Sequence, residues 1–287
     1  SKSFHIYKDI PDDIRFDVFI VTVSTPLAGG TSKTPNMDFL DNSIRSIAPH
    51  VTLDSLVILR STIPVGSSAL VERQISKIKQ LDFIDISFCP ERTAEGKALV
   101  ELQSLPQIIS GNTDSAVRKA RNFFEPLTDE IVEAASLEEA ELIKLFNNTY
   151  RDASFAIANS FNQIAQSFNI DGLSAINNAN YNYPRSAIPK PGFVAGPCLE
   201  KDAYILSSNM ANGDLKEFIL GVRKANENLE NLVANKLREI INTDLNKKIL
   251  ITGIAFKGIP QNNDLSGSSS VNGLGKPSDF ASCLTIH

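Results

Sequence analysis

Residues 17–23, D-V-F-I-V-T-V, are almost continuously apolar and rich in β-branched side chains. A strand covered on both faces has this composition, whereas a strand with one wet face alternates apolar and polar residues. Thr25 and Pro26 follow and predict the end of the strand. The stretch therefore predicts a strand of a parallel sheet that carries helices on both sides.

The same pattern recurs outward from this strand. Helices are predicted at 37–47, 67–80 and 114–124, and strands at 56–59, 84–89 and 108–111. This alternation predicts a doubly wound α/β sheet, in which ligands bind beyond the carboxyl ends of the strands. Three segments fall at such ends: S-T-P (24–26), S-T-I-P-V-G (61–66) and C-P-E-R-T-A-E-G-K (89–97). Ordinary turn chemistry is the competing interpretation of each segment.

A long helix is predicted at residues 136–168, opened by the capping-box pattern S-L-E-E. At about 1.5 Å per residue it would be roughly 50 Å long, which favours a link between domains or a homodimer interface. Lys144, Asn148 and Arg151 share one face of this helix. Because the opposite face, which includes Phe146, is apolar, these polar side chains are candidates to line a site. A solvated face is the alternative interpretation.

Residues 191–202, P-G-F-V-A-G-P-C-L-E-K-D, place Cys198 after a Gly- and Pro-rich loop and at the start of a predicted helix. The positive end of the helix dipole and the charge of Lys201 both favour the thiolate, which is the nucleophilic form. Asp202, one turn further on, can orient a base or a water. The competing interpretation is a small buried hydrophobe, since most free cysteines are of that kind.

Composition disfavours several functional classes. The net charge of −5 gives no electrostatic case for nucleic acid or an anionic membrane as partner. We find neither an apolar run long enough to span a bilayer nor a secretory signal pattern. Three widely spaced cysteines predict a reducing, cytoplasmic setting without disulfides. No Cys/His cluster with metal-ligand spacing is present, so no metal site is predicted.

Seven motifs occur in order: V-S-T-P-L, S-T-I-P-V-G, C-P-E-R-T-A-E-G-K, A-E-L-I-K-L-F-N-N-T-Y-R-D, Y-P-R, P-G-F-V-A-G-P-C-L-E-K-D and G-I-A-F-K-G-I-P-Q-N-N-D-L. Over residues 14–266 the chain thereby resembles the UDP-glucose/GDP-mannose dehydrogenase family, most closely its UDP-N-acetylmannosamine dehydrogenase-like members. The resemblance implies an enzyme that oxidises the C6 alcohol of a nucleotide sugar to a carboxylate with two NAD⁺. It implies Cys198 as the nucleophile that captures the intermediate aldehyde and carries a thioester.

The resemblance also assigns roles by motif position. It implies substrate contact and alkoxide stabilisation for Lys144 and Asn148, and activation of the hydrolytic water for Asp202 with Thr62. It implies a sugar contact for Glu91 and a place near the cofactor and a catalytic water for Glu95. For Glu91, as for Arg185, an ordinary surface salt bridge is the alternative interpretation. The remaining implied contacts are those of Thr25, Thr62 and Lys201 with NAD, and of Arg185, Pro191, Ala195 and Lys257 with the UDP-sugar.

The resemblance predicts three domains. They are a partial NAD-binding, Rossmann-like domain (1–134), a central helical and dimerisation domain with Cys198 (135–242), and the start of a UDP-sugar-binding domain (243–287) with a polar, poorly packed tail after Asp264. No G-x-G-x-x-G motif follows any predicted strand. The chain is therefore expected to be truncated at both ends relative to the family, and Ala195 replaces a family glycine beside the substrate.

Alternative functions remain open. A catalytically inactive fragment that acts as a dimerising scaffold is the second interpretation, favoured by the absent glycine-rich loop. A 3-hydroxyacid dehydrogenase of similar plan is disfavoured, because a single two-electron oxidation needs no cysteine. Among substrates, UDP-N-acetylmannosamine is expected before UDP-glucose and GDP-mannose.

Overall fold

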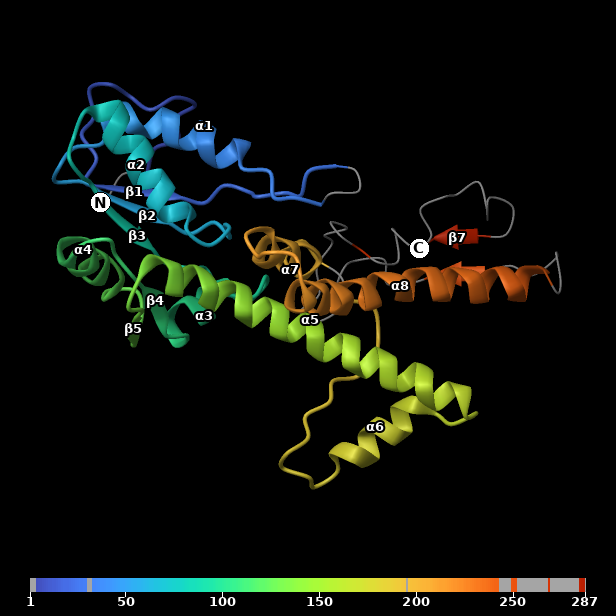
Figure 1. Cartoon of the computed structure of the whole chain (residues 1–287). Coiled ribbons are helices and arrows are strands. Elements are labelled where there is room, and N and C mark those ends of the chain that lie inside the picture. Colours follow the sequence, from blue (N-terminus) through green and yellow to red (C-terminus); the bar gives the residue numbers. More distant parts are fainter. Residues whose placement is uncertain are drawn as a thin grey trace. The chain divides into compact units, whose positions relative to one another are not determined.

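A computed structural model of the chain describes residues 4–29, 33–194, 196–242, 249–251, 268 and 284–286 (Figure 1). The chain divides into two compact units, Ser1–Leu145 and Phe146–His287. The predicted site residues Ala195 and Lys257, together with most of the tail after Asp264, lie outside the described residues.

The first unit is built on a parallel sheet of three strands in the order β1-β2-β3. β1 (Val18–Val21) pairs with β2 (Leu56–Leu59), and β2 pairs with β3 (Asp85–Phe88). The prediction of an α/β fold with a parallel sheet is confirmed. In the part of the chain that the structure describes, β1 has a neighbouring strand on one side only, and its Ile20 is 43% exposed.

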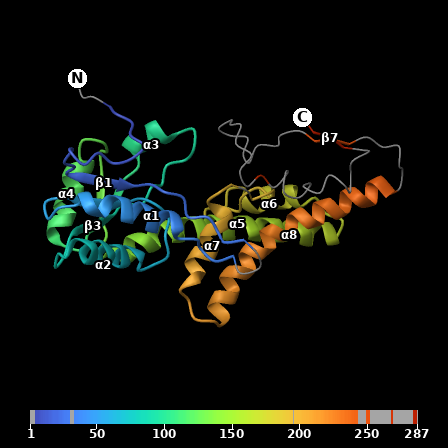
Figure 2. The ribbon, with the colours of Figure 1, turned by 90° about the horizontal axis from the view of Figure 1, so that it is seen from above.

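Helices cover both faces of this sheet, as the apolar strands predict. The covering elements are α1 (Asp38–Ile47), the 3-10 helix η1 (Ala48–His50) and α2 (Ser67–Lys79) on one face, and α4 (Asp114–Phe124) on the other. Figure 2 shows α1 and α2 side by side. Alternate residues of β2 belong to the two cores: Val57 and Leu59 pack with α1 and α2, whereas Leu56 and Ile58 pack with α4.

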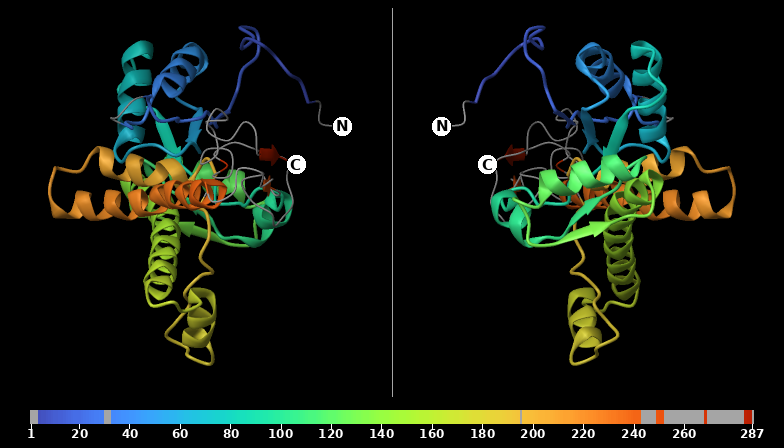
Figure 3. Two further views of the ribbon diagram at one scale, coloured as in Figure 1. Left: turned by 90° about the vertical axis from the view of Figure 1, so that its right-hand side faces the viewer. Right: turned by 90° about the vertical axis from the view of Figure 1, so that its left-hand side faces the viewer.

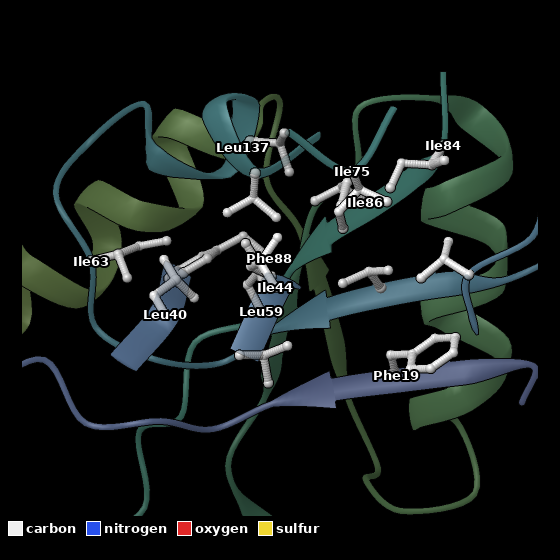
Figure 4. Packing of buried hydrophobic residues seen from close by; sticks show 14 of the residues in the cluster. Phe19, Leu40, Ile44, Leu59, Ile63, Ile75, Ile84, Ile86, Phe88 and Leu137 are labelled. Atoms are coloured by element: carbon white, nitrogen blue, oxygen red, sulfur yellow. The ribbon is translucent and has the colours of Figure 1, made fainter. Parts of the chain in front are cut away.

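The larger core closes around the sheet face that α1 and α2 cover (Figure 4). Its labelled members are Phe19, Leu40, Ile44, Leu59, Ile63, Ile75, Ile84, Ile86, Phe88 and Leu137. The last of these belongs to α5 (Leu137–Ser167), so the beginning of the long helix is anchored in the first unit.

Two short strands and one helix complete this unit. β4 (Gln107–Ile109) and β5 (Ile131–Glu133) form a parallel pair, and α3 (Ala98–Ser104) precedes them. The sequence patterns predicted β4 but neither β5 nor α3. Both lack the signal that periodicity detects, because β5 is short and partly exposed and α3 contains no buried residue.

The second unit is mainly helical. After α5 come α6 (Gly172–Asn180), α7 (Leu199–Ser208) and α8 (Asp214–Asn242). Figure 3 shows α7 and α8 as a helical hairpin. β6 (Ile249–Ile251) pairs in parallel with β7 (Leu284–Ile286). Among the helices that can be described, none combines the length and the apolar character needed to cross a membrane.

The long helix differs in one respect from its predicted packing. Leu145 is fully buried, but Phe146, expected on the packed apolar face, is 55% exposed. Phe146 is not an isolated exception, because further large apolar side chains of α5 are exposed at helical spacing from it. We call Phe146, Tyr150, Ile157, Phe161 and Ile164 of α5, together with Phe168 directly after its last residue, the α5 apolar stripe; each is at least 44% exposed.

Candidate active site

Cys198 lies at the N-cap position of α7, with an exposed side chain. Its carbonyl accepts hydrogen bonds from Lys201 N (3.2 Å) and Asp202 N (3.0 Å), which begin the helix. Gly196, two residues earlier, has φ = +104°, a left-handed conformation that favours glycine. The Gly-rich loop and the helix start predicted from the sequence therefore present the thiol at the amino end of α7, where the dipole stabilises an anion.

A hydrogen bond between Asp202 of α7 and Asn148 of α5 joins the two helices, and Asp202 lies one turn after Cys198. Asn148 Nδ2 donates to Asp202 Oδ2 at 2.5 Å, and both residues are buried. Asp202 is 1% exposed, so this carboxylate is fixed rather than freely solvated. The structure thus links two residues of the predicted site, a carboxylate and an amide, one helical turn after Cys198.

Lys144 lies one turn before Asn148 on α5, so the two side chains project from the same face of the helix. Lys144 is half-buried. Lys201 is also half-buried and follows Cys198 by three residues in the first turn of α7. Arg151, the third polar residue predicted on the α5 face, is exposed.

The loop between α6 and α7 carries the remaining site residues of this unit. Arg185 is exposed and donates from Nε to Tyr183 Oη at 3.1 Å, with its guanidinium 4.6 Å from the tyrosine ring centroid. Asn180 fixes the loop by bonding both main-chain groups of Ile188, at 2.8 and 3.0 Å. Pro191, half-buried, follows this anchor.

In the first unit, side chains tie the carboxyl ends of β1 and β2 together. Thr25 Oγ1 donates to Thr62 O at 2.6 Å, and Ser61 Oγ donates to Val23 O at 2.6 Å. Thr25 is buried and Thr62 is half-buried. These two predicted cofactor contacts therefore lie side by side at the strand ends, where ligands bind in α/β sheets.

Glu91 follows the carboxyl end of β3 and forms an ion pair with Arg60, while it also accepts from Thr93 N at 2.7 Å. Burial opposes ionisation of Glu91, but these hydrogen bonds and the Arg60 charge outweigh it and lower the pKa of Glu91. Glu91 also lines a small surface hollow whose wall includes Arg92. Glu95 is exposed and is not part of that wall.

A buried glutamate of α5 occupies the amino end of α2. Glu141 is 1% exposed and accepts from Gly66 N (2.5 Å), Ser68 N (2.8 Å) and Ser68 Oγ (2.6 Å). Burial is the largest influence on this carboxyl and raises the pKa of Glu141 despite those bonds. Sequence reasoning missed Glu141, and the only signal was a charged residue between apolar positions of the long helix.

The amino end of α2 is not open to an anionic ligand, because Glu141 occupies it. The pyrophosphate of a dinucleotide commonly rests on a helix amino end, but at α2 a protein carboxylate already takes that place. Across the residues that can be described, no cluster of His, Cys, Asp and Glu is arranged to hold a metal ion.

Comparison with known proteins gives a consistent result. Residues 1–128 match the NAD-binding domain of the UDP-glucose/GDP-mannose dehydrogenase family, and residues 138–228 match its central domain. The UDP-N-acetyl-D-mannosamine dehydrogenases of Methanocaldococcus jannaschii and Pyrococcus horikoshii are each 33% identical to this chain. The alignments cover 85% and 84% of it, and 56% and 58% of those proteins.

Solved structures agree with the sequence matches. The UDP-D-ManNAc dehydrogenase of Pyrococcus horikoshii superimposes with a TM-score of 0.83 at 29% identity, covering 94% of this chain and 64% of that one. The UDP-N-acetyl-mannosamine dehydrogenase of Staphylococcus aureus gives 0.79 at 27% identity, covering 95% and 64%. The chain spans 56–58% of the length of the two relatives aligned by sequence. With both domain models matched in order, the chain belongs to the UDP-glucose/GDP-mannose dehydrogenase family.

Proposed function

We propose that this chain carries the catalytic groups of an NAD-dependent UDP-sugar 6-dehydrogenase, with UDP-N-acetylmannosamine as the preferred substrate and UDP-glucose next. The observation that carries the proposal is the hydrogen bond from Asn148 to Asp202 in the first turn of α7, which begins at the exposed Cys198. The names of the relatives at 33% identity support the choice of sugar.

In the proposed reaction, the primary alcohol loses a proton and a hydride and becomes an aldehyde. The Cys198 thiolate attacks the aldehyde carbon, and the resulting thiohemiacetal loses a second hydride and a proton to leave a thioester. Water cleaves the thioester to the carboxylate and frees the thiol. NAD, when bound, supplies the hydride acceptor for each oxidation, and we assign its contacts to Thr25, Thr62 and Lys201.

The other roles follow from the chemistry of each side chain. Lys144 and Asn148 offer N–H donors to the oxyanions that develop on the substrate. Asp202, held by Asn148, accepts a proton from the water that attacks the thioester. For Thr62 and Glu95 we propose the positioning of that water.

The ionised carboxylate of Glu91 suits a hydroxyl of the sugar, and Arg185 and Pro191 suit the nucleotide-sugar. For Ala195 and Lys257 the corresponding substrate contacts rest on sequence resemblance alone.

The test is turnover by the full chain with NAD⁺ and UDP-N-acetylmannosamine, followed by NADH absorbance and by mass spectrometry of the sugar. We expect two NADH per uronic acid formed. Cys198→Ser should stop acid formation, whereas the matched control Cys89→Ser, which alters a thiol buried at the end of β3, should retain it. Equal activity of Cys198→Ser and the unmodified chain would refute the thioester route.

A second candidate function is dimerisation without catalysis, and the α5 apolar stripe favours it. Its members recur at intervals of three, four or seven residues, the spacing of a helix–helix seam. We propose a homodimer through this stripe. A chain that is dimeric by sedimentation but binds no NAD⁺ in calorimetry at millimolar concentration would favour the scaffold over the enzyme.

A further inference from the structure

The second unit contains a buried polar network between α5 and α8. Asp152 of α5 and Arg223 of α8 form an ion pair, with Arg223 Nη1 2.7 Å from Asp152 Oδ1. Asn226 donates from Nδ2 to the main-chain oxygen and to Oδ1 of Asp152, both at 2.8 Å. All three residues are at most 2% exposed, so their polar groups depend on one another rather than on bulk water.

Asn159 extends this network to the loop that precedes Cys198. Its Nδ2 donates to Asn226 Oδ1 at 3.0 Å and to Gly192 O at 2.9 Å, and its Oδ1 accepts from Gly192 N at 2.7 Å. Gly192 itself is exposed, whereas Asn159 is 3% exposed. A surface loop is therefore tied to the interior through both main-chain groups of one residue.

Arg223 reaches the other end of the same stretch. Its Nη1 also donates to the carbonyl of Leu199 at 3.2 Å. Leu199 is the first residue of α7 and directly follows Cys198. The network thus contacts the main chain at both ends of residues 192–199, the segment that contains the thiol.

We propose that Asn159 and Arg223 are positioning residues, which hold the two ends of residues 192–199 and thereby fix Cys198 for attack on the aldehyde. The role in attack rests on the proposed function; the anchoring of the segment does not. Asp152 and Asn226 orient the two anchoring side chains.

Energetics favour positioning over a purely stabilising role. A buried ion pair can often be replaced by apolar residues without loss of stability, because desolvation offsets the attraction between the charges. Helices α5 and α8 could therefore pack through apolar contacts alone. The network instead directs three hydrogen bonds to main-chain groups of the segment around Cys198. A nucleophile must be held close to its attack geometry, and fixed supporting bonds achieve this.

The experiment is hydrogen exchange measured by mass spectrometry on the full chain and on Asn159→Ala. The matched control is Asn228→Ala, which changes an exposed asparagine of α8 outside the network. We expect peptides within 190–199 to exchange about tenfold faster in Asn159→Ala, while peptides of α5 and α8 exchange as before. Asn228→Ala should leave the 190–199 peptides unchanged.

Arg223→Lys is the second variant. It keeps a positive charge opposite Asp152 but lacks the planar guanidinium, whose Nη1 donates to both Asp152 Oδ1 and Leu199 O. The same peptides should loosen in it. The unmodified chain gives a check that needs no variant, because the exposed Gly192 amide, which donates to Asn159, should exchange more slowly than the amide of the exposed Asn182. An unprotected Gly192 amide, or faster exchange spread evenly over α5, α7 and α8, would overturn the proposal.

Turnover separates this proposal from the proposed function. If the unmodified chain produces no NADH but the exchange result holds, the anchoring stands and the dehydrogenase assignment fails. If it turns over, Asn159→Ala should lower kcat by about tenfold and leave the KM for NAD⁺ unchanged. An unchanged kcat would overturn the positioning role while leaving the enzyme assignment intact.

Discussion

Replacing Glu141 with alanine should destabilise the first unit strongly, although the residue has no assigned role in the reaction. The carboxylate is 1% exposed and accepts three hydrogen bonds from Gly66 and Ser68 at the start of α2. Alanine leaves two main-chain N–H groups and one hydroxyl without that acceptor. An orphaned buried donor costs about 1–3 kcal/mol. Since Gly66 is half-buried and water can reach part of the gap, we expect a total loss of about 3–4 kcal/mol.

Glutamine at this position separates the hydrogen bonds from the charge. The carbonyl oxygen of glutamine still accepts a hydrogen bond, and a neutral side chain does not pay the cost of burying a charge, which is what raises the pKa of Glu141. We therefore expect the free energy of unfolding to fall by about 1 kcal/mol. Because the pKa is raised, this carboxyl contributes stability below its ordinary value of 4.5 that is lost as pH rises through the folded value. Glu141→Gln should lack that dependence.

The assay is urea unfolding followed by circular dichroism, since the chain contains no tryptophan. The matched control is Glu138→Ala, an exposed glutamate in the first turn of the same helix, which should cost less than about 1 kcal/mol. Equal losses for Glu141→Ala and Glu138→Ala would refute the reasoning, because the free energy would then not come from the contacts at α2.

Three further predictions follow from other parts of the structure. Burial opposes ionisation of Asp85, but its hydrogen bonds, led by that from Lys119, outweigh this effect and lower the pKa of Asp85. The stability that the ionised Asp85 contributes is therefore present above pH 3.8 and is lost as the pH falls below that value. Asp85→Asn should cost about 2–3 kcal/mol at neutral pH in urea unfolding, a gap that narrows in acid; a constant gap would contradict this. Burial raises the pKa of Cys89 to about 11, so iodoacetamide at neutral pH should alkylate the exposed Cys198 and spare Cys89 in peptide mass spectrometry; equal labelling would be the contrary result. Phe161→Glu, in the middle of the α5 apolar stripe, should convert a sedimenting dimer to monomer at micromolar concentration, and an unchanged dimer would exclude this seam.

The sequence predicted those elements whose pattern is strong. β1 and β2 lie within apolar runs, β3 lies within the predicted strand 84–89, and α4 occupies residues 114–124 as predicted. The capping hydrogen bond predicted at the start of α5 is also present, since Glu139 N donates to Ser136 Oγ at 3.1 Å. Short or exposed elements such as α3 and β5 could not be predicted, because they bury too little to impose a periodicity.

The residues of the candidate site also differ in how far the sequence predicts them. Cys198 and Asp202 were found because their chemistry is local: a thiol at a helix start and a carboxylate one turn later. The anchoring roles of Asn159 and Arg223 could not be found, since each depends on partners that are distant in the sequence, Gly192 and Asp152 respectively. A single sequence gives no means of pairing a polar helix residue with a loop more than thirty residues away.

The one-sided pairing of β1 has a consequence for handling the protein. Within the described ranges, the outer edge of this strand leaves main-chain N–H and C=O groups without a ladder partner, and Ile20 is 43% exposed on its face. Such an edge is a template for another strand, and self-association through it is a route to cross-β aggregates. Because that route depends on collisions between chains, its rate rises with protein concentration. We therefore expect dilute refolding and storage away from the isoelectric point near 5.3 to slow this self-association.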